Sequence, residues 1–172
     1  FDLKQHEEFS GKKLQYFDPE LGENYVPYVV ETSIGLDRMF LAILSNSLQT
    51  EQLEDGSSRT VMNVPAFLAP YKVAVLPLLK KDGLPEKARD VVNALKFDHM
   101  VQYDEKDAIG KRYRRQDAAG TPLCVTVDHQ TLEDNTLTVR FRDTMKQIRI
   151  PMDELNGLVA QKVSLSEQFS KL

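Results

Sequence analysis

The sequence of 172 residues has no tryptophan, a single cysteine and no long hydrophobic run. Because Cys124 has no partner in the chain, an internal disulfide and a multi-cysteine zinc site are excluded, and no metal site is expected. No apolar stretch approaches the roughly 20 residues of a membrane-spanning helix. The N-terminal segment FDLKQHEEFS lacks the basic-then-apolar pattern of a signal peptide. We therefore expect a cytoplasmic protein without a membrane partner. Its first residue, Phe1, predicts a processed product or a piece of a longer chain.

The net charge of −4 is unevenly distributed. Residues 1–70 carry five basic and eleven acidic side chains, whereas residues 71–172 carry 17 basic and 15 acidic ones. Within the second part, residues 106–117 and 140–149 each have a net charge of +3. A general nucleic-acid coat has a basic domain throughout, so this chain predicts at most a confined phosphate-facing surface. Solvated faces of helices and strands are the alternative interpretation of the two clusters.

Residues 71–172 predict an α/β fold. The nearly continuous apolar run 71–79 is typical of a strand buried on both faces, and the alternation in 137–141 indicates a half-buried strand. Apolar residues three and four apart after Pro85 predict a helix. The expected strands are 71–79, 99–103, 122–127, 137–141 and 148–150, and the expected helices are 85–95, 108–119 and 152–159. This order, β-α-β-α-β-β-β-α, predicts a mixed sheet flanked by helices.

The first part of the chain predicts a short strand at 28–30, a turn at Gly35 and a helix beginning at Leu36. A helix N-terminus carries unpaired N–H groups that attract anions, although such junctions are also common packing architecture. The polar segment 49–58, QTEQLEDGSS, predicts a loop. We therefore divide the chain into two domains, 1–60 and 61–172.

Two long motifs resemble a known family. Residues 25–44, YVPYVVETSIGLDRMFLAIL, closely resemble the third signature motif of class II aminoacyl-tRNA synthetases, in the form found in glycyl-tRNA synthetases. The leading FDLKQHEEFSGKKLQYFD is similar to the segment just upstream in those enzymes. Residues 109–128, IGKRYRRQDAAGTPLCVTVD, are similar to the anticodon-binding domain that glycyl, threonyl, prolyl and histidyl enzymes share. The resemblance covers essentially the whole chain. It implies the end of an antiparallel class II catalytic domain, followed by an anticodon-binding domain.

The resemblance also implies roles for individual residues. Glu31 and Ser33 would bind glycine, within a substrate segment that is made up of Glu31, Thr32, Ser33, Ile34 and Gly35. ATP, with Mg²⁺, would be a substrate of the full-length enzyme and would lie against Gly35, Leu36, Asp37 and Arg38. No cofactor is expected to be tightly bound in this chain. Thr32 stands where family members commonly have proline, which leaves the shape of this loop open.

For the second part, the resemblance implies anticodon recognition. The basic residues expected to contact tRNA(Gly) are Lys111, Arg112, Arg114, Arg115, Arg140 and Arg142. The first two signature motifs of the class would lie upstream of Phe1, so this piece should not aminoacylate alone. A homodimer is implied for the full-length enzyme, whereas the piece alone is expected to be a monomer that binds no DNA. The alternatives are a free-standing anticodon-like accessory module and a sister enzyme for threonine, proline or histidine.

Overall fold

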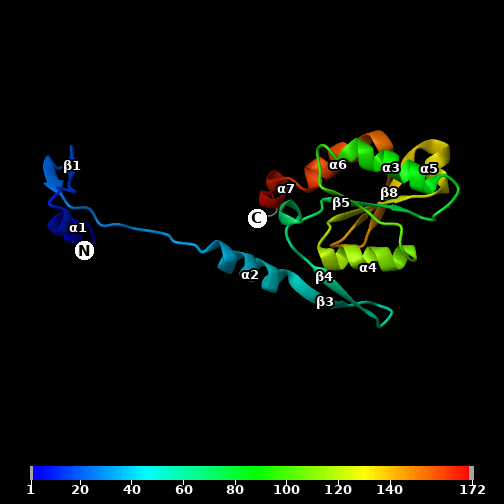
Figure 1. Cartoon of the computed structure of the whole chain (residues 1–172), viewed down its shortest axis with the longest axis horizontal. Coiled ribbons are helices and arrows are strands. Elements are labelled where there is room, and N and C mark those ends of the chain that lie inside the picture. The colour runs from blue at the N-terminus through cyan, green and yellow to red at the C-terminus, as the bar shows by residue number, and fades with distance from the viewer. Residues whose placement is uncertain (1, 171–172) are drawn as a thin grey trace. The chain divides into compact units, whose positions relative to one another are not determined.

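The computed structural model describes residues 2–170, and Figure 1 shows the order of their helices and strands. The described chain forms two compact units, which divide between Met39 and Phe40. The boundary predicted at residues 60 and 61 stays a prediction. None of the helices within residues 2–170 combines the length and the apolar character needed to cross a bilayer.

The first unit contains a helix, a short hairpin and the start of a second helix. Helix α1 spans Asp2–Ser10, and strands β1 (Tyr16–Asp18) and β2 (Glu23–Tyr25) pair antiparallel. Asp18 closes the hairpin turn because its carboxylate accepts hydrogen bonds from the backbone N–H groups of Glu20 and Leu21. The rings of Tyr16 and Tyr25, which are paired across the strands, meet edge to face with their centroids 5.9 Å apart.

The strand predicted at 28–30 is wrong. Residues 26–35 form no helix or strand, and the side chains of Tyr28 and Val30 are more than 90% exposed. A strand needs a neighbour to accept its backbone hydrogen bonds, and no described segment pairs with this one. The helix predicted after Gly35 is confirmed as α2, Leu36–Ser47.

The loop predicted at 49–58 is confirmed only for residues 53–57, which connect the two strands of a β-hairpin; residues 49–52 and 58 belong to the strands. Strand β3 (Leu48–Gln52) follows α2 directly and pairs antiparallel with β4 (Ser58–Met62). The side chains of β3 are mostly exposed, so its polar composition imitates a loop. In β4, Arg59 and Val61 are buried while Thr60 between them is exposed, as the two-residue period of a strand requires.

The predicted mixed sheet is confirmed in the second unit. Five strands lie in the order β6-β5-β7-β8-β9, with β5 parallel to β6 and β7, and with β8 antiparallel to both β7 and β9. The strands are β5 (Val73–Pro77), β6 (Val101–Tyr103), β7 (Leu123–Val127), β8 (Thr136–Phe141) and β9 (Gln147–Pro151). The helices are α3 (Leu84–Leu95), α4 (Ile109–Ala119), α5 (His129–Asp134), α6 (Leu155–Lys162) and α7 (Leu165–Phe169), with one-turn helices at η1 (Ala66–Leu68) and η2 (Met152–Glu154). Helices α5 and α7 were not predicted.

Helices cover both faces of this sheet, with α3, α5 and α6 on one side and α4 on the other (Figure 1). The side of α3 and α6 is a large apolar core, in which Val75 and Val125 pack against Leu84 and Leu155. The side of α4 has a small apolar cluster of Ala74, Leu76 and Cys124, on which Ile109 and Tyr113 pack. The rest of the α4 layer is polar, and this difference between the layers determines where charged side chains lie.

Candidate RNA-binding surface

The topology brings three loops to one edge of the sheet. Strand β5 leads to β6 on one side, and the chain then crosses through α4 to β7 on the other side of β5. In open sheets of this kind, ligands bind at the carboxyl ends of the strands where the direction of winding reverses. The loops that leave β5, β6 and β7 all start at this edge.

Exposed cations line the loops after β5 and β6 and the first turns of α4. We call the set the carboxyl-edge surface; its members are Lys80, Lys81, Lys106, Lys111 and Arg114. Within residues 2–170, Lys80, Lys106 and Lys111 form no salt bridge, and Lys81 approaches Asp82 at 3.8 Å only. The structure thus keeps several cations available for an anionic ligand.

Arg115 is exposed, but its guanidinium is bound to the loop between β6 and α4. Its guanidinium donates to the Asp104 carboxylate at 2.7 and 3.1 Å, to Asp107 at 2.8 Å and to the Lys106 carbonyl at 2.6 Å. The hydrogen bond with Arg115 lowers the pKa of Asp107, and the bonds with both carboxylates raise the pKa of Arg115. Asp107 itself has a φ of 67°, an unusual value that the surrounding contacts must hold.

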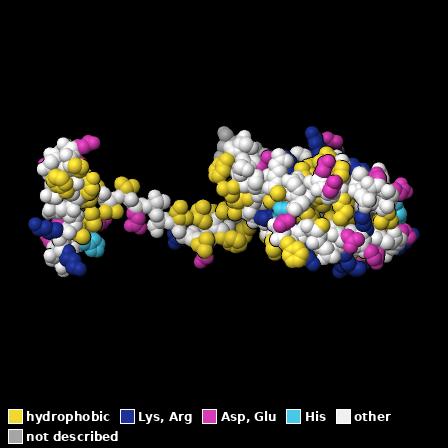
Figure 2. All heavy atoms as spheres, turned by 90° about the horizontal axis from the view of Figure 1, so that it is seen from above, with side chains coloured by type: hydrophobic (Ala, Val, Ile, Leu, Met, Phe, Trp, Pro, Cys, Tyr) yellow, Lys and Arg dark blue, Asp and Glu magenta, His cyan; other side chains and the backbone are white. Residues whose placement is uncertain are grey.

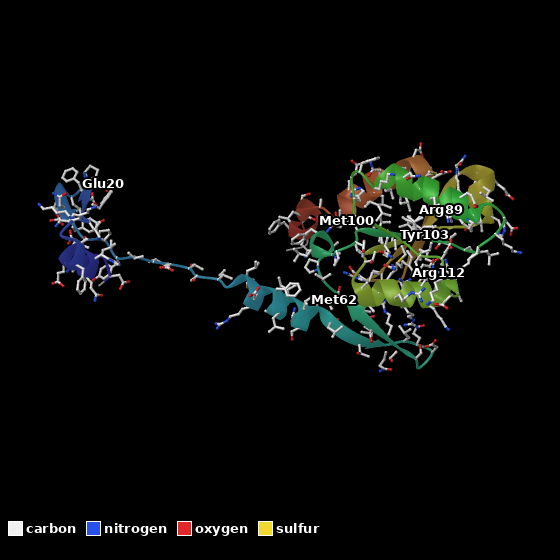
Figure 3. The ribbon with its side chains drawn as sticks, in the orientation of Figure 1. Glu20, Met62, Arg89, Met100, Tyr103 and Arg112 are labelled. Atoms are coloured by element: carbon white, nitrogen blue, oxygen red, sulfur yellow. The ribbon has the colours of Figure 1, made fainter. Side chains whose placement is uncertain are left out.

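Arg112 lies at the inner side of α4 and is only 2% exposed (Figure 3). Its Nη1 donates to the carbonyls of Pro77 and Asp104, at 2.5 and 3.3 Å, and its Nη2 donates to the carbonyl of Leu78 at 3.1 Å. Its Nε is buried without a hydrogen-bond partner in the described chain, and burial lowers the pKa of the group. In this structure Arg112 holds loops rather than facing solvent. Its predicted contact with tRNA stays a prediction.

Arg140 and Arg142 share one face of the region around β8, as expected, but both are buried rather than solvated. Arg140 forms a bidentate salt bridge with Asp117 of α4, at 2.7 and 3.0 Å. Arg59 of β4 reaches the same carboxylate at 3.1 Å. The alternation of apolar and basic residues in 137–141 predicts a strand with one solvent-exposed face, but α4 and the β3–β4 hairpin cover that face.

Arg142 connects the hairpin to the end of α4. Its guanidinium donates to the carbonyls of Met62 and Gly120, at 3.1 and 2.8 Å, and to the side chains of Asn63 and Asp143. Of the six residues predicted to contact tRNA, the structure therefore exposes only Lys111, Arg114 and Arg115 to solvent, whereas Arg112 of the same helix is buried. Their contact with RNA stays a prediction.

Arg59 was not singled out from the sequence, although its side chain is buried and it joins two elements. It forms salt bridges with Glu51 at 2.6 Å and with Asp117, and it donates to the Arg142 carbonyl at 3.0 Å. The alternation in Ser58–Met62 was the signal that could have identified it. A polar strand beside a Gly-Ser turn concealed this pattern.

Tyr113 serves packing in this structure. Its ring lies under the Arg140 guanidinium, 4.9 Å from ring centroid to Cζ, and its hydroxyl shares a 2.6 Å hydrogen bond with Thr126 Oγ1. The ring also covers the small apolar cluster that includes Cys124. These contacts fix the face of α4 that lies on the sheet, so the opposite face is presented to solvent.

Cys124 is expected to be unreactive in the folded protein. It lies in β7 at 1% exposure, and burial raises the pKa of its thiol to about 12. Because the thiolate is the reactive form, labelling by a disulfide reagent at pH 8 should be at least about a hundredfold slower in buffer than in 6 M urea. In the unfolded chain this thiol loses its proton above about pH 9, whereas in the folded protein it stays protonated up to about pH 12. Deprotonation therefore favours the unfolded state, and the free energy of unfolding falls as the pH rises past 9. Equal labelling rates in buffer and urea would contradict the burial of Cys124.

The predicted glycine and ATP segment lies in one continuous stretch. Residues 31–35 have no regular structure, and Leu36, Asp37 and Arg38 form the first turn of α2. The Met39 N–H donates to the Gly35 carbonyl at 3.0 Å, so the helical hydrogen bonding starts at Gly35. All side chains from Glu31 to Arg38 are exposed. The assignment of these residues to glycine and ATP stays a prediction.

Comparison with known proteins identifies the second unit. A family model described as "Anticodon binding domain" matches residues 72–162. The chain is 52% identical over 163 residues to a protein named glycine–tRNA ligase from Clostridium tetani, covering 95% of this chain and 35% of that protein. It is 52% identical to a protein of the same name from Chlorobaculum tepidum, and 51% identical to one from Treponema denticola. The chain spans about a third of the length of the curated relatives it matches.

Proposed function

Because the chain belongs to the anticodon-binding domain family, we propose that its second unit binds the anticodon loop of a tRNA through the carboxyl-edge surface. The observation that carries the proposal is that the matched range, 72–162, contains every member of that surface. Anticodon bases are single-stranded, so a protein reads them through their edges and by stacking while cations hold the phosphates. Lys111 and Arg114 extend from α4 and would hold the phosphates.

The opposite layer is unsuited to RNA. Figure 2 views the side of α3, α5 and α6, and acidic side chains lie there around exposed hydrophobic atoms. The exposed carboxylates of α3, α5 and the one-turn helix η2 that precedes α6 are Glu86, Asp90, Glu133, Asp134, Asp153 and Glu154. They repel phosphates, so the charge distribution directs RNA to the side of α4 and the carboxyl edge.

We further propose that the longer protein containing this chain attaches glycine to tRNA(Gly) in the cytoplasm as a homodimer. Its support is the 52% identity that extends across the Glu31–Arg38 segment to the glycine–tRNA ligases. The Glu31 carboxylate would hold the glycine amino group, and Ser33 would help to shape a cavity too small for larger side chains. Arg38 would pack on ATP, which enters with Mg²⁺ as a substrate. Aminoacylation by the full-length protein with glycine, threonine, proline and histidine tests this assignment.

The anticodon proposal predicts a preference that survives moderate salt. Fluorescently labelled tRNA(Gly) and an anticodon-swapped copy are titrated with the chain at 50 and 150 mM KCl. We expect tighter binding of tRNA(Gly) at both concentrations, because base contacts are less sensitive to salt than phosphate contacts. Equal affinity for the two RNAs would contradict the proposal.

A pair of double variants shows which surface is used. Replacing Lys111 and Arg114 by methionine should weaken binding about tenfold and reduce the salt slope by about 1.4, because two phosphate contacts are lost. The matched control replaces Arg89 of α3 and Lys96, which follows the end of α3, and so removes the same charge from the opposite layer. The control should bind tRNA(Gly) like the unchanged chain. A larger loss in the control would place the RNA on the α3 side.

A further inference from the structure

We infer that Arg112 is a positioning residue, which holds two loops of the carboxyl edge in the arrangement that RNA binds. This inference rests on the proposed function. It also reverses the expectation that Arg112 contacts the tRNA itself, because its guanidinium is enclosed by protein.

The acceptors of Arg112 come from two different loops. Pro77 ends β5 and Leu78 follows it, whereas Asp104 follows β6. All three backbone carbonyls receive hydrogen bonds from the one guanidinium of Arg112. A planar guanidinium can bridge separate acceptors in this way, and an ammonium reaches fewer of them in fixed geometry. Arg112 therefore joins the loop after β5, which carries Lys80 and Lys81, to the loop that carries Lys106.

Arg115 secures the second loop from its solvent side. It lies one helical turn after Arg112 and binds Asp104, Asp107 and the Lys106 carbonyl. Asp104 is thus held by Arg112 from within, through its carbonyl, and by Arg115 from outside, which also holds Asp107 and the Lys106 carbonyl. The two roles differ in burial, since the Arg115 side chain is 42% exposed and that of Arg112 is enclosed.

By ordering these loops in the free protein, Arg112 and Arg115 increase the affinity for RNA through preorganisation. A loop that is ordered before binding loses less conformational entropy when the RNA arrives. Loosening Arg112 therefore weakens binding without changing which phosphates the bound RNA contacts. Removing a cation that touches a phosphate has a different signature, because it lowers both the affinity and the dependence of affinity on salt.

Two neighbouring residues of α4 allow a matched comparison. In Arg112→Lys the charge is kept but the bridging geometry is lost, and in Lys111→Met an exposed cation is removed from the same helix. We expect Arg112→Lys to bind tRNA(Gly) about tenfold more weakly with an unchanged salt slope. In Lys111→Met the salt slope of tRNA(Gly) binding should be smaller by about 0.7. Amide hydrogen exchange in the free protein should accelerate at 104–107 in Arg112→Lys, and not in Lys111→Met.

Each other result overturns the inference in an identifiable way. A slope reduced in Arg112→Lys as much as in Lys111→Met would make Arg112 a phosphate contact. Unchanged affinity would limit Arg112 to folding, and unchanged exchange at 104–107 would show that it does not hold the loop. Should Arg112→Lys not fold, Arg115→Gln releases the same loop from outside and must also accelerate exchange there. If the unchanged chain does not bind tRNA(Gly), the proposed function and the RNA role of Arg112 are both overturned. Amide hydrogen exchange at 104–107 would still show whether Arg112 holds the loop.

Discussion

Replacing Asp117 by alanine is expected to lower the free energy of unfolding by about 3–5 kcal/mol, because the change leaves two buried arginines without their shared partner. The Asp117 carboxylate is 0% exposed and lies between Arg59 and Arg140. Burial lowers the pKa of Arg140, but the hydrogen bonds and the charge of Asp117 outweigh that effect and raise it overall. A guanidinium stays protonated over the ordinary pH range, so Arg140 remains a buried charge when Asp117 is removed. Urea unfolding followed by circular dichroism measures the loss.

Asp143→Ala is the control for this change. Asp143 also pairs with a buried arginine, through a 2.6 Å contact with Arg142, but its own side chain is 58% exposed. Arg142 keeps its acceptors on Met62, Asn63 and Gly120, so we expect a loss of at most about 1 kcal/mol. A loss below about 1 kcal/mol for Asp117→Ala would show that the buried charges do not hold the hairpin and α4 together.

Gly120→Ala is expected to destabilise the protein by about 3 kcal/mol, from two causes that add. Gly120 ends α4 with a φ of 82°, a conformation that an L-residue adopts only with strain. A Cβ at this position would also meet Val64 Cγ1 at 3.0 Å and the Met62 carbonyl oxygen at 3.1 Å. The close approach arises because β4 and the segment after it pack directly on the end of α4.

Gly83→Ala separates the two causes. Gly83 has a similar φ of 79°, but a Cβ there would find nothing within 4 Å. Its replacement should therefore cost about 1 kcal/mol, the conformational part alone. Equal losses for Gly83→Ala and Gly120→Ala in thermal or urea unfolding would mean that the hairpin does not pack against the end of α4 as described.

The elements that the sequence predicted are those whose signal is local. The buried run that became β5, the apolar stripe of α3 and the glycine that ends α4 are each visible within a dozen residues. The strand expected at 28–30 failed because pairing depends on a distant neighbour. Helix α5 has a local signal that was missed, since Asp128 and Thr131 form a capping box at its start.

The candidate site could be predicted only in part for the same reason. Basic residues at 106–117 predicted an anion-binding region, but sequence cannot distinguish a solvated arginine from one that faces the sheet. Arg112 is buried and Arg114 is exposed because α4 packs on the sheet through the side that carries Tyr113. The burial of Arg140 depends on Asp117, 23 residues away, and on Arg59 of β4, a strand that the sequence analysis does not predict.

The most direct test of the central claim is to map where the anticodon loop of tRNA(Gly) touches the chain. Amide chemical shifts of the isotope-labelled protein are recorded while an anticodon stem-loop is added. We expect the shifts to change at residues 78–83, 104–108 and the solvent face of α4, with α3 and α6 unaffected. Changes confined to α3 and α6, or no saturable change at all, would contradict the assignment of the carboxyl edge as the RNA-binding surface.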